Sequence, residues 1–231
     1  FFAVIWFHAP HEPVVAGPQY RAQYRDFTEG EQHFYGCISA LDEQVGRLRA
    51  ELQRLGIAEN TMLWYASDNG PEGTTHSKGR RRGSAGPLRG RKRSLFEGGV
   101  RVPGILEWPG RVRPGQTTAV PCSTLDYFPT VLAALGFELT GRPKPQDGVN
   151  LIPLIEARTQ ERPVPIGFQT PGSDEAATAA RLGSPDHALI GNRYKLLSFL
   201  EEARAGEDIL FDITIDPGER YNLAGEMPDM V

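Results

Sequence analysis

The sequence predicts an α/β protein: a mixed, mainly parallel sheet flanked by helices, with a small antiparallel sheet near the C-terminus. Two apolar, strand-like runs at 1–7 and 61–66 enclose a long amphipathic helix pattern, which is the order of a parallel strand–helix–strand crossover. The second run stops abruptly at a polar turn, as buried strands do. Short strand patterns nearer the C-terminus flank a turn signature at 191–193, which predicts a hairpin.

Composition narrows the range of functions. The 231 residues suffice for one large domain or two small ones, and 39% hydrophobic and 23% charged residues are ordinary for a globular protein. The net charge of −4 argues against a generally basic nucleic-acid-binding surface. The apolar run Phe1–Phe7 is too short to span a bilayer, and Cys37 and Cys122 imply no disulfide framework. We therefore expect neither a nucleic-acid nor a membrane partner.

The chain begins with Phe1–Phe7, which reads as a buried strand with no initiator Met or signal sequence before it. Because folds rarely begin inside a strand, we expect the chain to be the C-terminal part of a longer protein. A loop with two prolines follows, containing His8 and His11. The prolines remove the helical spacing that zinc-binding histidine pairs use, which disfavours a zinc site and favours a backbone-bonded loop histidine or a functional one.

A long helix is expected next. Thr28 and Glu31 fit a capping box, and Gly56 is a stop signal. Between them, apolar residues recur with alternating spacings of four and three, a helical stripe that favours packing on the sheet over a coiled coil. Its members are Phe34, Ile38, Leu41, Val45, Leu48, Leu52 and Leu55.

The strand at 61–66 leads to Asp68 and Asn69. Ligands of open α/β sheets bind at the carboxyl ends of strands, and a carboxylate beside an amide carbonyl suits Ca²⁺ or Mg²⁺. The alternative is an Asx turn that merely closes the loop. The following segment is rich in glycine and strongly cationic, which favours a site for a small tetrahedral oxyanion but also fits a polyanion-binding surface. Its basic residues are Lys78, Arg80, Arg81, Arg82, Arg89, Arg91, Lys92, Arg93 and Arg101.

The remaining chain supplies a strand at 102–108, a helix at 124–135 and the short strands of the C-terminal sheet. A polar, proline-containing stretch from 156 to 165 suggests a junction, so we expect domains at 1–160 and 161–231. The first would be an α/β catalytic unit and the second a small α+β subdomain.

Two motifs together carry a resemblance to a known family. Ser67-Asp68-Asn69-Gly70, followed by Gly90-x-Lys92-x4-Glu97-Gly98-Gly99-x-Arg101-x-Pro103, resembles the second half of a type I, arylsulfatase-like sulfatase. That family belongs to the alkaline-phosphatase-like superfamily and hydrolyses sulfate esters. The resemblance implies the same α/β fold with a small C-terminal antiparallel sheet.

The resemblance also implies roles for individual residues. Asp68 and Asn69 would bind Ca²⁺, with Mg²⁺ as the alternative metal, and Lys92 would bind a sulfate oxygen. His11 lies in the Pro-His-x-Pro position, where it would assist the leaving group. Glu97 with Arg101 would be structural support for the loop.

The family's nucleophile is a formylglycine made from the first residue of a C/S-x-P-x-R motif, which is absent from this sequence. We therefore expect an N-terminal half of the same protein to supply it, and the isolated chain to be inactive. The expected substrate is a small-molecule or carbohydrate sulfate ester, and the expected location is periplasmic, extracellular or lysosomal. A phosphoester or phosphonate hydrolase of the same superfamily and a non-catalytic anion-binding fragment are the alternatives.

Overall fold

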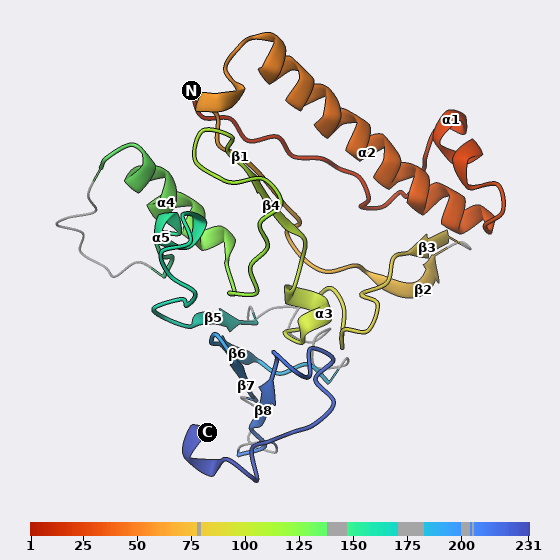
Figure 1. Cartoon of the computed structure of the whole chain (residues 1–231). Coiled ribbons are helices and arrows are strands. Elements are labelled where there is room, and N and C mark those ends of the chain that lie inside the picture. The colour runs from red at the N-terminus through yellow and green to blue at the C-terminus, as the bar shows by residue number, and fades with distance from the viewer. Residues whose placement is uncertain (78–79, 138–146, 171–182, 200–203, 205) are drawn as a thin grey trace.

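The structure is a computed structural model that describes residues 1–77, 80–137, 147–170, 183–199, 204 and 206–231 (Figure 1). Its helices and strands form an α/β arrangement with a four-stranded antiparallel sheet in the C-terminal part, which confirms the predicted class. The elements in chain order are α1 (Pro18–Arg21), η1 (Ala22–Tyr24), α2 (Glu29–Arg54), η2 (Ala58–Asn60), β1 (Leu63–Ala66), β2 (Gly73–Ser77), β3 (Arg80–Arg82), α3 (Glu97–Val100), β4 (Gly104–Glu107), η3 (Thr124–Asp126), α4 (Tyr127–Ala134), α5 (Ile152–Ile155), β5 (Ile166–Gln169), β6 (His187–Ile190), β7 (Tyr194–Ser198), β8 (Ile209–Asp212) and η5 (Pro228–Met230).

The long helix α2 begins and ends where the sequence predicts. The backbone N–H and the hydroxyl of Thr28 both donate to the Glu31 carboxylate, at 3.1 and 2.6 Å. Gly56 follows the helix with a φ of 68°, the left-handed conformation that glycine adopts without strain. The apolar stripe is only partly covered, because Leu52 is buried whereas Leu55 remains 52% exposed.

The strand predicted at 1–7 is wrong. Among the described residues no strand pairs with this segment, and the side chains of Phe1 and Trp6 are 99% and 92% exposed. The expected parallel crossover is therefore absent from the described structure, and β1 instead pairs antiparallel with β4. An apolar run needs a hydrogen-bonding neighbour before it becomes a strand, since its backbone groups require partners.

The pair β1–β4 forms the centre of the first half of the chain (Figure 1). Its register runs from Leu63 opposite Glu107 to Ala66 opposite Gly104, so the predicted strands at 61–66 and 102–108 are present in shortened form. Trp64 on β1 stacks on Tyr127, with ring centroids 4.3 Å apart. This contact attaches α4 to the strand that leads to Asp68.

The C-terminal sheet has the strand order β5-β6-β7-β8, and every neighbouring pair is antiparallel. The predicted hairpin is present, closed by Gly191 N–H donating to Tyr194 O at 2.9 Å. Leu197 and Phe211 contribute to a buried cluster that also contains Phe96, the residue just before α3. Figure 1 shows α3 between the β1–β4 pair and this sheet, so the cluster joins the two halves of the chain.

A second buried contact crosses position 160. The predicted helix at 124–135 is present as η3 followed by α4, and Asp126 at its start is buried. Arg162 donates to both carboxylate oxygens of Asp126, at 2.7 and 2.9 Å. The Asp126 carboxylate also accepts from the backbone N–H groups of Ser123 and Val149, so its charge is well compensated.

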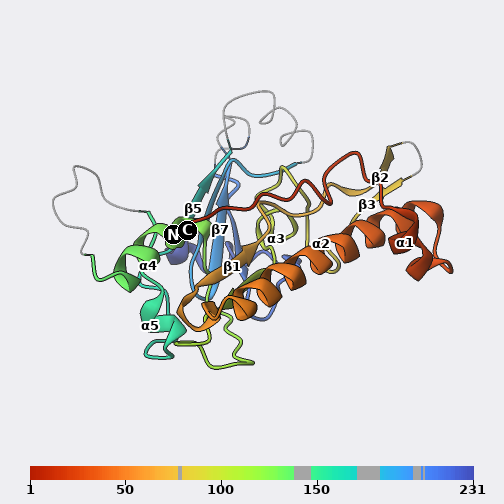
Figure 2. The same cartoon turned by 90° about the horizontal axis from the view of Figure 1, so that it is seen from above.

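Figure 2 shows α1 and the start of α2 at one end of the molecule and α4 and α5 at the opposite end, with the four-stranded sheet between them. Across the described residues, no helix combines the length and the apolar character that crossing a membrane requires.

Candidate active site

The turn after β1 carries the predicted metal ligands. Ser67 N–H donates to Pro103 O at 3.4 Å, and the Ser67 hydroxyl donates to Asn69 O at 2.9 Å. The turn is therefore held to the residue just before β4 and is also stabilised by a hydrogen bond of its own. Asp68 is exposed and Asn69 is half-buried. Within the described structure, the Asp68 carboxylate forms no hydrogen bond or ion pair, so both of its oxygens are open to a ligand.

The same turn packs tightly against α3. Gly70 N–H donates to Gly99 O at 2.8 Å. A Cβ atom at Gly70 would lie 1.9 Å from Gly98 O, far inside any permitted contact. Glycine is thus needed here for close approach of two backbones, and this approach fixes the Asp68 turn relative to α3.

Lys92 is attached to the same turn from the other side. Its backbone N–H donates to Pro71 O at 2.9 Å, one residue beyond Gly70. Gly98 N–H donates to Arg89 O at 2.6 Å, so α3 also holds the start of the loop that carries Lys92. The structure therefore brings together the segments that contain Asp68, Asn69, Lys92 and Glu97.

The described cations of this loop differ in whether they have a partner. The Arg89 guanidinium lies 3.8 Å from the centroid of the Phe96 ring, and Arg93 pairs with Glu72 at 2.6 Å. Arg91 also pairs with Glu72, at 3.5 Å. Among the residues of this loop whose side chains are described, Lys92 is the cation without a hydrogen bond or ion pair.

Glu97 is buried, with 3% of its surface exposed, and its main partner is not Arg101. Its carboxylate accepts from Lys195 Nζ on β7 at 2.9 Å, whereas the Arg101 guanidinium is 3.5 Å away at the rim. A carboxylate oxygen of Glu219 also lies 2.9 Å from Lys195 Nζ. Glu97 and Arg101 are thus in contact as expected, within a larger cluster.

The sequence interpretation missed Lys195 and Glu219. A signal for Lys195 exists in β7, where side chains alternate between the two faces and Lys195 and Leu197 occupy the same, fully buried one. A lysine in phase with a buried leucine needs a buried counter-charge. Glu219 carries no comparable local signal, because its contact with Glu97 spans 122 positions.

His11 lies in a separate loop. Its Nδ1 is 3.1 Å from Glu12 O, and its backbone N–H donates to His8 O at 2.8 Å. In the described part of the chain, no hydrogen bond or ion pair joins His11 to Asp68, Asn69 or Lys92. The loop is anchored to α2 through Ala16 N–H, which donates to Nδ1 of the buried His33 at 3.1 Å.

The donor set suits a hard divalent cation but is incomplete. Asp68 and Asn69 offer the carboxylate and amide oxygens that Ca²⁺ and Mg²⁺ prefer, and Ca²⁺ takes about 6–8 oxygen ligands. No group of three or more His, Cys, Asp or Glu side chains gathers at one point among the described residues. These two residues can therefore supply only part of a coordination shell.

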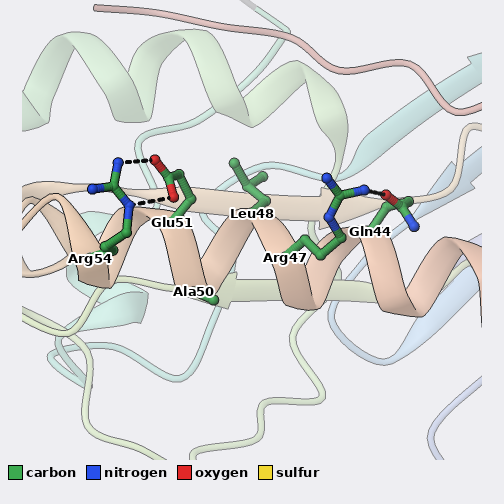
Figure 3. Close-up of a pocket in the computed structure, with 6 residues that line it drawn as sticks. All are labelled: Gln44, Arg47, Leu48, Ala50, Glu51 and Arg54. Atoms are coloured by element: carbon green, nitrogen blue, oxygen red, sulfur yellow. Dashed lines mark hydrogen bonds and ion pairs between the residues drawn. The ribbon is translucent and has the colours of Figure 1, made fainter.

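A shallow surface pocket lies elsewhere, along one face of α2 (Figure 3). Its polar groups pair within the helix: Arg47 donates to Gln44 at 2.7 Å, and Arg54 donates to Glu51 at 2.8 and 2.5 Å. All the residues that line it belong to that helix, namely Gln44, Arg47, Leu48, Ala50, Glu51 and Arg54. With no groups from other elements converging on it, this pocket is not the candidate site.

Comparison with known proteins defines the class to which this fold and site belong, the alkaline-phosphatase-like superfamily. The sulfatase family profile matches residues 1–137, which is more than half of the chain. A second profile, N-sulphoglucosamine sulphohydrolase, C-terminal, matches residues 90–230. The chain belongs to the sulfatase family, and the resemblance drawn from its motifs is confirmed.

Individual relatives agree with this assignment. Human (Homo sapiens) arylsulfatase A is 31% identical over 249 residues, covering 97% of this chain and 44% of the relative. Rat (Rattus norvegicus) steryl-sulfatase is 36% identical over 167 residues, covering 69% of this chain and 27% of the relative. The crystal structure of Ps i-CgsB has a TM-score of 0.79 at 27% identity and covers 97% of this chain and 46% of that one. The chain thus spans less than half the length of each.

Proposed function

We propose that this chain is part of a sulfatase that hydrolyses sulfate esters at the Asp68 turn and the Lys92 loop. The observation that carries the proposal is that, among the described residues, Lys92 has no hydrogen-bonding or ionic partner and is held by its backbone next to the turn of Asp68, whose carboxylate has none either. An available ammonium and an available carboxylate on adjoining segments fit a site that binds a divalent cation and an oxyanion together.

In this proposal, Lys92 donates to a non-bridging sulfate oxygen and stabilises the negative charge that develops during transfer. Asp68 and Asn69 would hold part of the metal's coordination shell, and the bound metal would supply Lewis-acid polarisation of the sulfate. The backbone contacts through Gly70 and Pro71 keep both groups in place without reorganisation during the reaction. Preorganised charge of this kind is commonly the largest single contribution to catalysis.

His11 is proposed to protonate the bridging oxygen of the leaving group. Its Nδ1 lies against Glu12 O, and because a carbonyl oxygen only accepts, Nδ1 carries the proton of the neutral ring. Donation from Nε2 therefore requires the doubly protonated imidazolium.

The nucleophile and the remaining metal ligands are proposed to come from an N-terminal part of the same protein. The 231 residues contain no C/S-x-P-x-R motif for a formylglycine, and the relatives are more than twice as long as the segments that match. Carbohydrate sulfates are the proposed substrates, because one similar crystal structure is a complex with k-i-k-neocarrahexaose (TM-score 0.78, 28% identity). An exported or lysosomal location is proposed from family membership alone.

The test uses the full-length protein and an aryl sulfate. We expect Lys92→Ala to lower kcat/KM at least 100-fold, the order seen when one charge-stabilising donor is removed. Arg93→Ala is the matched control, because it removes the neighbouring cation, which is already paired with Glu72, and should change the rate less than about threefold.

Near-normal activity in Lys92→Ala would show that the site is wrongly assigned. A preference for an aryl phosphate or phosphonate over the sulfate would favour the other hydrolases of the superfamily. Salt-sensitive binding of an anionic polysaccharide, with no hydrolysis of any ester, would favour a non-catalytic module.

A further inference from the structure

A buried ion cluster connects α3 to the C-terminal sheet. Lys195 Nζ on β7 lies 2.9 Å from a carboxylate oxygen of Glu97 and 2.9 Å from one of Glu219. The exposed fractions of these three residues are 0%, 3% and 1% in the same order. The cluster therefore joins three segments that are far apart in sequence: a strand, α3 and the turn that follows β8.

The charges in this cluster depend on one another. Burial raises the pKa of Glu219, while the Lys195 ammonium opposes that shift. Two carboxylates share this one buried lysine, with the half-exposed Arg101 as a third, more distant partner of Glu97. Removing the lysine would leave two carboxylates facing each other out of water, which is strongly unfavourable.

Glu219 adopts a backbone conformation that supports a specific role for its side chain. Its φ is 54°, in the left-handed region that non-glycine residues seldom occupy. The second oxygen of Glu219 accepts from Glu97 N–H at 2.6 Å, and so satisfies the first amide of α3. A strained residue whose side chain makes buried, long-range contacts is a candidate for function, and here the contacts are with Lys195 on β7 and with α3.

Direct backbone contacts connect α3 to the two segments of the candidate site. Gly98 and Gly99 bond to Arg89 and Gly70, which flank the Lys92 loop and the Asp68 turn respectively. A Cβ atom at Gly98 would lie 2.5 Å from Gly90 O, so the helix and the loop touch backbone to backbone. A displacement of α3 must therefore move the segments that carry Lys92 and Asp68.

We propose that Lys195 and Glu219 are positioning residues of the sulfatase site: they fix α3 and, through it, the Lys92 loop and the Asp68 turn. The inference rests on the proposed function and assigns a catalytic contribution to the C-terminal sheet. Neither residue touches substrate. Their effect is geometric, and a misplacement of about 1 Å at a reacting group can lower a rate about 100-fold.

The test compares three variants of the full-length protein well below their melting temperatures. Lys195→Met keeps the length of the side chain and removes the charge. Glu219→Gln keeps an acceptor for Glu97 N–H and is the milder change. Leu210→Ala is the control, because Leu210 is equally buried in the adjacent strand β8 but lies outside the ion cluster.

Two readouts are needed: steady-state kinetics with an aryl sulfate, and hydrogen exchange of peptides covering 67–72 and 89–99. We expect Lys195→Met to lower kcat at least tenfold and to speed exchange in both peptides. Glu219→Gln should show the same pattern at a smaller amplitude, and is decisive if Lys195→Met does not fold. Leu210→Ala should lower the melting temperature but leave kcat and both peptides within twofold of wild type.

The outcomes separate this inference from the proposed function. Wild-type turnover with unchanged kcat and exchange in a folded Lys195→Met or Glu219→Gln variant overturns the positioning role and leaves the sulfatase assignment intact. Absence of turnover in the wild type overturns the assignment, and faster exchange in the variants then still establishes the mechanical link. An equal loss of kcat in Leu210→Ala would reduce the effect to general destabilisation and so contradict the inference.

Discussion

Gly70 and Gly98 occupy positions at which even a methyl group has no space. The atoms in the way are backbone carbonyl oxygens, which cannot rotate aside as a side chain can. We expect Gly70→Ala to lower the free energy of unfolding by about 1–3 kcal/mol or more, since overpacking forces backbone shifts. Because the displaced segment leads from Asp68, activity of the full-length protein should fall as well.

Gly46 supplies the control for this prediction. It lies inside α2, and a Cβ atom there would have no other atom within 4 Å. Gly46→Ala should therefore raise stability by roughly 0.5–1 kcal/mol, because alanine loses less entropy than glycine on entering a helix. Thermal and urea unfolding measure both variants. Equal stability of the two would contradict the close approach at Gly70.

At the same scale, the candidate-site residues identified from sequence lie in local motifs, and their roles stay predictions. Asp68, Asn69 and Lys92 lie within one loop region, and their segments meet in the structure through Gly70 and Pro71. Lys195 was not predicted, because its partners Glu97 and Glu219 are brought to it by tertiary folding alone. Whether His11 acts with the others stays a prediction, since no hydrogen bond or ion pair joins it to them in the described structure.

At the scale of elements, the helices and strands that could be predicted from sequence are those stabilised by interactions between residues close together in the chain. The boundaries of α2 were predictable because the capping box and Gly56 lie next to the helix itself. The strand at 1–7 was not, because a strand exists only beside a partner that local sequence does not specify. The predicted parallel pairing of β1 was wrong for the same reason, because its neighbour in the structure is β4 and the pairing is antiparallel.

One surface ion pair ties two elements together and predicts a pH effect. Arg49 on α2 donates to both oxygens of Glu107 on β4, at 2.5 and 2.9 Å, and this hydrogen bonding lowers the pKa of Glu107. The carboxylate is then more easily protonated in the unfolded chain than in the folded one. The stabilisation is present above the ordinary pKa of 4.5 and is lost as the pH falls through the lower, folded value.

We therefore expect Glu107→Gln to destabilise the protein near neutral pH by less than about 1 kcal/mol, because both side chains are partly exposed. Urea unfolding at pH 7 and below pH 4 measures the difference, which should vanish at the acid end. Arg49→Ala should remove the same pH-dependent part, and the double variant should lose no more. A difference that persists unchanged in acid would contradict the pairing.

At the scale of the whole molecule, the contacts do not follow the compositional junction near residue 160. Asp126 pairs with Arg162 across it, and Phe96 lies in the core of the C-terminal sheet. Composition predicted a junction at the polar, proline-containing stretch near residue 160. It could not predict that α3 would contact both the turn after β1 and the C-terminal sheet. The C-terminal sheet thus belongs to the support of the candidate site as much as the β1–β4 pair does.

The 231 residues taken alone should hydrolyse no sulfate ester. In the proposal they contribute Lys92 for a sulfate oxygen and Asp68 and Asn69 for the metal, but they contain no C/S-x-P-x-R motif from which an aldehyde nucleophile could form. Charge stabilisation without a nucleophile leaves water as the attacking group, and Asp68 with Asn69 supplies too few ligands to hold a metal firmly. Adding millimolar Ca²⁺ or Mg²⁺ to the purified chain should therefore leave the rate of aryl sulfate hydrolysis at background.

The full-length protein is the positive control for this prediction, and the Lys92→Ala chain is the control for contaminating hydrolases. Turnover by the isolated chain that disappears in its Lys92→Ala variant would contradict the prediction. It would mean that sulfate ester hydrolysis requires no catalytic group outside these 231 residues. Background rates in both, beside an active full-length enzyme, are expected. Lys92 and Asp68 would then form the half of the site that binds and neutralises sulfate, and an upstream segment would provide the attack.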